Sequence, residues 1–228
     1  MTSVKNERAE RGEDGPVRTK PILRGVIHEL AFSAAVSAGV LLVSTARSGE
    51  AKLGCGLYAA SLAGLFGVSA LYHRPMWPEG VRSWLRRIDH AAIFVLIGGT
   101  YTPLALTLPS PLARQMLAVA WTGAALGVVR AVFFPRARRW VVALLALALG
   151  WASAAYLPEV HAVAGHTVTL LLALGGGLYS LGALAYAFRR PDPWPRVFGY
   201  HEIFHALVVL AAMCHFAAIA SALPVLTA

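Results

Sequence analysis

The chain alternates between long apolar stretches and short connections that hold most of its charged residues. A transmembrane helix needs about 20 predominantly apolar residues to cross a hydrocarbon core of about 30 Å. Stretches of this kind are predicted at Gly25–Thr45, Leu53–Tyr72, Ile88–Leu108, Leu112–Phe134, Trp140–Leu157, His166–Phe188 and Tyr200–Ala222. The pattern therefore predicts an all-α membrane protein, a seven-transmembrane helical bundle.

The first 24 residues differ from the rest, because they carry many charges of both signs and no apolar run. Residues 1–24 are predicted to form a disordered cytosolic tail, and residues 25–228 the membrane domain. A signal peptide would place an apolar core of about 7–15 residues after a short basic start. The first apolar stretch is about 20 residues long instead, which indicates an uncleaved first span.

The composition excludes an ordinary soluble domain, since 57% of the residues are hydrophobic and 14% are charged. In a soluble protein, the formal net charge of +9 would suggest a nucleic-acid partner. Here the basic residues lie in short connections, so membrane topology explains the charge and no nucleic-acid partner is expected. Cys55 and Cys214 fall in separate apolar stretches and are predicted to be buried free thiols.

Lysines and arginines divide unevenly between the two sides of the predicted bundle. All but three of the 20 lie in the tail or in the second, fourth and sixth connections. The opposite side carries only Arg47, Lys52 and Arg114. The positive-inside rule then predicts a cytoplasmic N-terminus and an outside C-terminus, in a multi-pass protein of the inner (plasma) membrane.

Five polar residues stand where apolar stretches meet basic connections. Ser69 and His73 close the second stretch, Asp89 opens the third, and His201 and His205 open the seventh. With the predicted topology, all five lie at the cytoplasmic boundary. Residues far apart in sequence are therefore expected to gather at one face of the membrane.

The three histidines of this group have the spacing and chemistry of metal ligands. His201 and His205 are four residues apart, so both rings lie on one face of a helix. With His73 they supply three neutral imidazoles, which suit zinc and leave a fourth tetrahedral position for water. A bound zinc lowers the pKa of such a water to about 7. The pattern predicts a catalytic rather than a structural Zn²⁺ site.

Asp89 and Ser69 are predicted to act beside that metal. A carboxylate inside a membrane span is costly and is a functional candidate by default. We expect Asp89 to hydrogen-bond the metal's water, as a general base or as an orienting group. Ser69 has two interpretations: it faces the same cavity and donates to a substrate carbonyl or the water, or it bonds a carbonyl of its own helix.

Three further ionisable residues lie at the same level without an assigned role. His28 and Glu29 are just inside the first stretch, and Glu202 adjoins His201 on a different helix face. Glu202 could pair with an arginine of the basic rim or support a ligand from outside the metal shell.

The remaining histidines are not expected to bind the ion. His90 points about 100° away from Asp89 on a helix, so a packing role is favoured. His161 and His166 fall in an external connection and are predicted to be solvated. His215 lies about 15 Å along the helix from His205, and we expect an interior polar contact.

Three segments, SALYHRPMW, RRIDHAAIFVLIGGTYTP and GYHEIFHALVVLAAMCHF, together resemble the hemolysin III family. This is the bacterial branch of the progestin and adipoQ receptor (PAQR) superfamily, and the resemblance runs from Arg24 to Ala220. It implies seven spans with the N-terminus inside, and a zinc ion held by His73, His201 and His205, with Ser69 and Asp89 around it. The superfamily is related to alkaline ceramidases and associated with lipid amide hydrolysis, and bacterial members are linked to membrane-fluidity homeostasis.

One motif of that family is not matched. Its usual first motif places an acidic residue before Asn and before Thr-His or Ser-His. The chain reads RGVIHELAF, in which His28 takes the histidine position but Pro21, Ile22 and Arg24 stand upstream. The role of that motif does not carry over to this chain.

Three functions compete. The leading hypothesis is a zinc-dependent intramembrane hydrolase acting on a lipid amide or ester, with membrane lipids as substrates. The second is a non-catalytic sensor or receptor in which zinc joins two helices. A cytolytic pore or transporter ranks last, because the fourth to sixth stretches have almost no polar residues. A homo-oligomer is compatible with each of them.

Overall fold

A computed structural model describes residues 20–108, 110–135 and 139–226. The predicted tail lies almost entirely outside these residues. The elements are α1 (Val26–Thr45), α2 (Gly49–His73), α3 (Glu79–Thr107), α4 (Pro111–Phe133), α5 (Arg139–Trp151), the 3-10 helix η1 (Ala152–Tyr156), α6 (Leu157–Phe188) and α7 (Tyr200–Leu226). No strand occurs in the described parts beyond an isolated bridge between Trp194 and Phe198. The all-α prediction is confirmed.

Local capping sets where the helices begin. The Ser48 hydroxyl accepts a hydrogen bond from the Ala51 amide at 3.1 Å at the start of α2, and Ser110 accepts one from Leu112 at the start of α4. Such caps satisfy amides that have no partner inside the helix. α3 begins at Glu79, nine residues before the predicted Ile88, because its first turns are polar and hydropathy marks only the apolar part of a helix.

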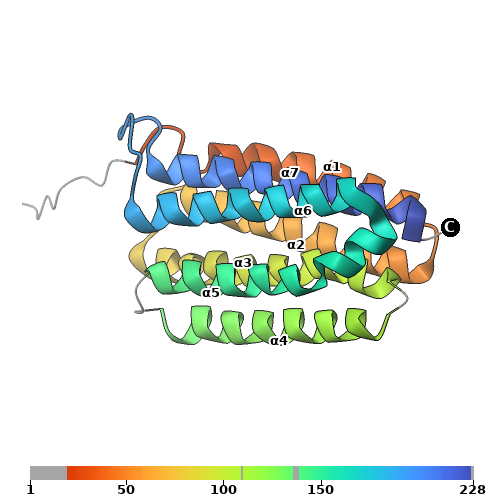
Figure 1. Cartoon of the computed structure of the whole chain (residues 1–228). Coiled ribbons are helices and arrows are strands. Elements are labelled where there is room, and N and C mark those ends of the chain that lie inside the picture. The colour runs from red at the N-terminus through yellow and green to blue at the C-terminus, as the bar shows by residue number, and fades with distance from the viewer. Residues whose placement is uncertain (1–19, 109, 136–138, 227–228) are drawn as a thin grey trace, which may run out of the picture.

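The number of spans differs from the prediction. Six helical stretches, rather than seven, are long and apolar enough to cross a membrane. The fifth of them, Trp140–Phe188, is 49 residues long and contains both the predicted fifth and sixth stretches. α5 alone has 13 residues, about 20 Å at 1.5 Å per residue, and falls short of the hydrocarbon core. The chain reverses within this stretch (Figure 1), with η1 and the left-handed Gly165 (φ 84°) at the turn.

The helices close into a ring. Each packs against the next in sequence, and α7 packs against α1. One apolar core cluster joins α1, α2 and α7 around Tyr58, Phe66 and Ile219, and another joins α3, α4, α6 and α7 around Tyr101 and Met116. The ring holds the N-terminal end of α7 next to the C-terminal end of α2.

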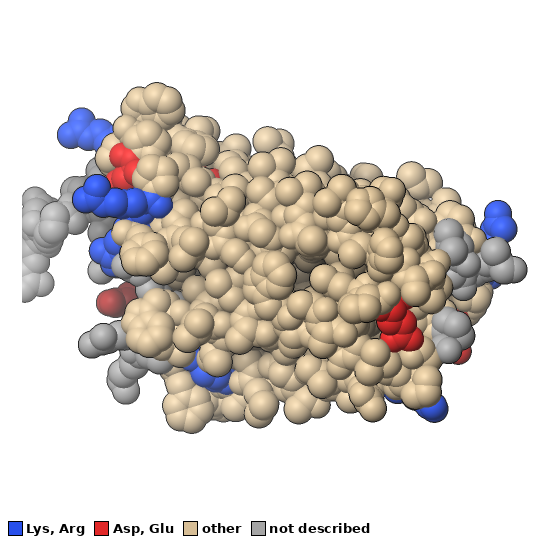
Figure 2. Space-filling model, in the orientation of Figure 1, with Lys and Arg blue, Asp and Glu red and all other residues tan. Residues whose placement is uncertain are grey.

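The outer surface suits a lipid environment. Large apolar side chains such as Leu30, Leu126, Leu174 and Met213 are exposed on the outside of the helices. Figure 2 shows an almost uncharged belt, with lysines and arginines gathered mainly at one end of the bundle. The chain therefore has the surface of a protein that sits within a bilayer.

A close approach between α3 and α4 depends on Gly127. A Cβ at this position would collide with the ring of Phe94, which is 1% exposed. We expect Gly127→Ala to lower the free energy of unfolding by about 1–3 kcal/mol through overpacking. Thermal melting of the purified protein in detergent measures the effect. Gly64→Ala is the control, because no atom lies near its added methyl group; equal melting of the two variants would contradict this packing account.

Candidate metal centre

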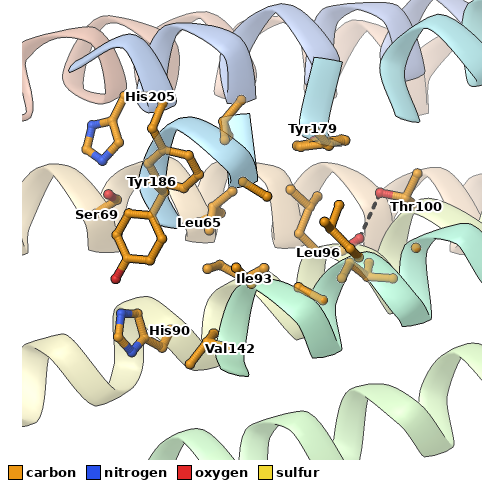
Figure 3. Close-up of a pocket in the computed structure, with 18 of the residues that line it drawn as sticks. Leu65, Ser69, His90, Ile93, Leu96, Thr100, Val142, Tyr179, Tyr186 and His205 are labelled. Carbon is orange, nitrogen blue, oxygen red and sulfur yellow. Dashed lines mark hydrogen bonds between the residues drawn. The ribbon is translucent and has the colours of Figure 1, made fainter. Parts of the chain in front are cut away.

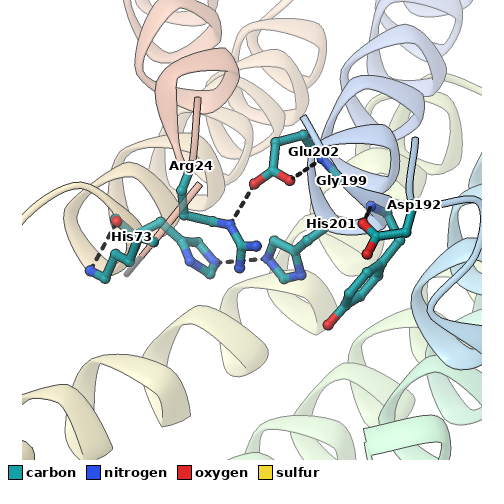
Figure 4. A network of polar contacts seen from close by, with 8 residues as sticks. Arg24, His73, Asp192, Gly199, His201 and Glu202 are labelled. Carbon is teal, nitrogen blue, oxygen red and sulfur yellow. Dashed lines mark hydrogen bonds and ion pairs between the residues drawn. The ribbon is translucent and has the colours of Figure 1, made fainter. Parts of the chain in front are cut away.

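The last turn of α2 and the first two turns of α7 bring three histidines together. One ring nitrogen from each of His73, His201 and His205 lies within 4.8 Å of the others. The Nε2 atoms of His73 and His201 are 3.2 Å apart (Figure 4). His73 and His205 are buried, and His201 is partly buried. The predicted clustering of these residues is confirmed, and the group could hold a metal ion.

The donor set fits a tetrahedral ion of zinc's size. Two nitrogens that are each about 2.0–2.1 Å from such an ion lie about 3.3 Å from one another. The observed His73–His201 separation of 3.2 Å is close to that value. The His205 ring centroid lies 4.5 Å from that of His201 and 5.0 Å from that of His73. Three neutral imidazoles at such separations are an ordinary zinc donor set.

Asp89 and Ser69 lie at the same end of the bundle. The Asp89 side chain extends from α3 and is 9% exposed, and Ser69 on α2 is 2% exposed. The Ser69 hydroxyl is a hydrogen-bonding partner of the Asp89 carboxylate. The hydroxyl therefore faces the carboxylate, as expected if Ser69 faces the shared cavity. Both residues line the same cavity as the three histidines.

A fourth imidazole, that of His28, belongs to this cluster. Its ring stacks on His205 with a centroid distance of 3.9 Å and an interplanar angle of 8°, and Phe66 packs against it at 5.1 Å. Both ring nitrogens are buried without a hydrogen-bond partner among the described residues. The parallel stacking places His28 where it fixes the plane of His205 rather than shares its ion. Its position in the family's first motif was the only sequence signal for this role.

The cluster opens into a long internal cavity of about 960 Å³. The cavity follows α3 from Arg82 to Leu104, about 33 Å at 1.5 Å per residue. Figure 3 shows Ser69, His90 and His205 near one end, and apolar side chains such as Ile93 and Leu96 farther along. Binding cavities for small molecules are typically about 300–1,000 Å³ and mostly apolar, with a few placed polar groups. This one has its polar groups at the histidine end.

Other histidines take the places expected of them, with one exception. His161 and His166 are exposed, and His215 Nε2 contacts the Leu172 carbonyl at 3.2 Å inside the bundle. His90 was predicted to have a packing role, but it lines the cavity. Cys55 and Cys214 are free thiols, as predicted.

Comparison with known proteins decides the family. The model of the family described as "Haemolysin-III related" matches residues 17–216. The chain belongs to the hemolysin III family. It is 34% identical over 174 residues to "Hemolysin-3" of Bacillus cereus, with 75% of this chain and 76% of that protein covered. It is 31% identical over 154 residues to "Hemolysin-3 homolog" of Bacillus subtilis (strain 168), with 67% and 69% covered.

Relatives outside the bacterial branch extend the similarity to the PAQR superfamily. The chain is 28% identical over 176 residues to the human "Monocyte to macrophage differentiation factor", covering 74% of this chain and 69% of that protein. A shorter match of 95 residues, 34% identical, is to the "Adiponectin receptor protein" of Drosophila melanogaster, of which it covers 17%. Together with the six candidate spans, membership makes this chain a multi-pass membrane protein.

In this hemolysin III protein, the segment of the unmatched first motif has a contact of its own. Arg24 forms an ion pair with Glu202, whose side chain is 1% exposed. The other carboxylate oxygen of Glu202 accepts a hydrogen bond from the Gly199 amide at 2.8 Å (Figure 4). Glu202 therefore pairs with an arginine and ties the segment before α1 to the start of α7. Glu29 instead pairs with Arg74 on the surface.

The Arg24–Glu202 pair predicts a stability effect. Arg24→Ala leaves the Glu202 carboxylate buried without its cation, and breaking a buried pair typically costs about 3–5 kcal/mol. Because the Arg24 side chain is 21% exposed, solvent reduces this cost and we expect about 3 kcal/mol. Thermal melting in detergent measures it. Adding Glu202→Gln to Arg24→Ala removes the unpaired charge and is expected to restore part of the loss; wild-type melting of the single variant would contradict the prediction.

Proposed function

We propose that this protein is a zinc-dependent intramembrane hydrolase that acts on a lipid amide or ester and contributes to membrane homeostasis. The observation that carries the proposal is the histidine triad beside Asp89 at the polar end of a long apolar cavity. A reactive centre at this place can meet the carbonyl of a lipid whose acyl chain lies along the cavity.

The proposal includes seven crossings of the inner membrane. The 49-residue stretch Trp140–Phe188 would be about 74 Å long if straight, more than twice the hydrocarbon core. It reverses near Gly165, and α5 packs against α6, which supports two crossings. The basic connections at the histidine end support a cytoplasmic N-terminus and an outside C-terminus. The centre would then open to the cytoplasmic side.

His73, His201 and His205 would hold the zinc. When bound, zinc supplies a Lewis acid for a carbonyl and acidifies water to a pKa of about 7. The protein's own contribution is to hold the three rings at fixed separations, and the His28 ring against His205 and the Arg24–Glu202 pair beside His201 support that arrangement.

Asp89 is the group that would move the proton. Its carboxylate would accept a proton from the attacking water and return it to the leaving amine or alcohol, as a general base and then a general acid. Ser69 would orient this carboxylate through its hydroxyl. The apolar wall beyond them would hold the acyl chain and exclude further water from the reaction.

A second candidate is a sensor in which zinc is a structural pin. It is favoured by the fact that the triad joins two helices far apart in sequence, α2 and α7. Such a site would need its three ligands but not the carboxylate of Asp89.

The test is release of fatty acid from defined lipids in nanodiscs. Purified protein is loaded with zinc and offered a ceramide, a simple N-acyl amine and a lysophospholipid, and mass spectrometry measures the free fatty acid. We expect release from at least one of these lipids, and its loss on removal of zinc. Equal release by metal-free protein, or none by the zinc-loaded protein, would overturn the proposal.

A further inference from the structure

The histidine end of the cavity carries a group of cations that the proposed chemistry does not use. Among the described residues, the cavity wall contains six basic side chains, those of Lys20, Arg24, Arg82, Arg86, Arg130 and Arg189. Asp89 is the only carboxylate of the described cavity wall. The mouth of the cavity is therefore strongly positive, although its interior is apolar.

One face of α3 contains the transition from charged to apolar. Arg82, Arg86, His90, Ile93 and Ile97 recur at three- and four-residue intervals, so they share one helix face, and all five line the cavity. The guanidinium groups come first along this face, the imidazole follows, and aliphatic side chains continue inward. This is the order of polarity along a lipid that enters with its acyl chain first and its headgroup last.

Most of these cations have no anionic partner in the described parts of the chain. The ion pairs there are Arg24–Glu202 and Arg74–Glu29, so Arg82, Arg86 and Arg130 take part in neither. The Nη2 atom of Arg130 is buried without a hydrogen-bond partner among the described residues. A buried donor without an acceptor is costly, and an anion at the mouth would supply the acceptor.

Lys20 adds evidence of uncompensated charge at this place. Burial lowers the pKa of Lys20, and so do the nearby charges of Arg82 and then Arg24. The Lys20 ammonium nonetheless donates hydrogen bonds only to carbonyl oxygens, those of His73 at 3.1 Å and Pro75 at 2.7 Å. The segment before α1, the end of α2 and the start of α3 therefore crowd positive charge together.

We propose that the mouth of this cavity binds the anionic headgroup of a lipid, a phosphate or a carboxylate, between Arg82, Arg86 and Arg130. Guanidinium groups match such oxyanions with pairs of parallel hydrogen bonds. The inference rests on the proposed function in one respect, because it makes the substrate an anionic lipid. Membrane topology explains an excess of basic residues at this end, but not their position on the cavity wall; Arg74 and Arg196 are exposed at the same end and do not line it.

The test measures headgroup selectivity without turnover. Full-length His201→Ala protein is incubated in detergent micelles with equal amounts of dioleoylphosphatidylglycerol and dioleoylphosphatidylcholine, purified again, and the retained lipids are quantified by mass spectrometry. We expect the anionic lipid to be retained with about tenfold preference or more. Arg82→Gln/Arg86→Gln is expected to reduce the preference about tenfold, whereas the matched pair Arg74→Gln/Arg196→Gln, with the same loss of charge, is expected to keep it.

Further arms keep the result decisive. Arg130→Gln, which replaces one cation on α4, is expected to lower the preference even if the α3 double variant does not fold, and Arg86→Lys is expected to retain most of it. Equal preference in all variants, or an equal loss in the matched pair, would overturn the headgroup site. Displacement of the phospholipid by excess inorganic phosphate would identify a site for free anions and overturn the lipid. Since no hydrolysis is needed here, intact selectivity with no fatty acid release by the wild type would count against the proposed function alone.

Discussion

Asp89→Asn is expected to keep bound zinc and to lose lipid hydrolysis by about 10²- to 10⁴-fold. The reason is that the proton leaving the attacking water needs a carboxylate within the same cavity, and Asp89 is the only one on the described part of its wall. The amide of asparagine has nearly the same shape and can still interact with the Ser69 hydroxyl. Zinc content is measured by elemental analysis and hydrolysis by fatty acid release.

The same variant separates catalysis from a structural role of zinc. Ser69→Ala is the matched comparison, because it removes the hydroxyl beside Asp89 and leaves the carboxylate in place. It is expected to lower the rate less than Asp89→Asn does. Wild-type hydrolysis by Asp89→Asn would contradict the assigned role, and an unchanged physiological output with retained zinc would favour the sensor.

His201→Ala is expected to weaken zinc binding by at least about 100-fold, since loss of groups that only support a ligand already costs about 10- to 100-fold. The matched control is His215→Ala, which removes another histidine from α7. The His215 ring contacts the Leu172 carbonyl and lies about 15 Å along the helix from His205. Zinc content of both purified proteins is the measurement. Equal zinc in the two variants would contradict ligation by His201.

The sequence was sufficient for the parts of the fold and the site that depend on local spacing. The apolar stretch predicted at Gly25–Thr45 corresponds to α1 at Val26–Thr45. The i, i+4 spacing of His201 and His205 placed both rings on one helix face, and the boundary position of His73 added the third. These inferences needed only helix geometry and the solvation of charged connections.

Features that depend on tertiary packing were not predictable in the same way. Hydropathy did not reveal that α5 is only 13 residues long, because η1 and the start of α6 continue the same apolar composition. The stacking of His28 on His205 joins residues at opposite ends of the chain. The pairing of Arg24 with Glu202 was one of two possibilities for Glu202, and only the closed ring of helices brings the two together.

The most direct measurement of the central claim is fatty acid release in water enriched in oxygen-18. Hydrolysis breaks the acyl bond with a water molecule, so one oxygen atom of the released carboxylate comes from solvent. We expect zinc-loaded wild-type protein to release singly labelled fatty acid from the lipid, Asp89→Asn to release little, and metal-free protein to release none until zinc is restored. Unlabelled product, or labelled product at the same rate without zinc, would contradict a zinc-dependent hydrolase.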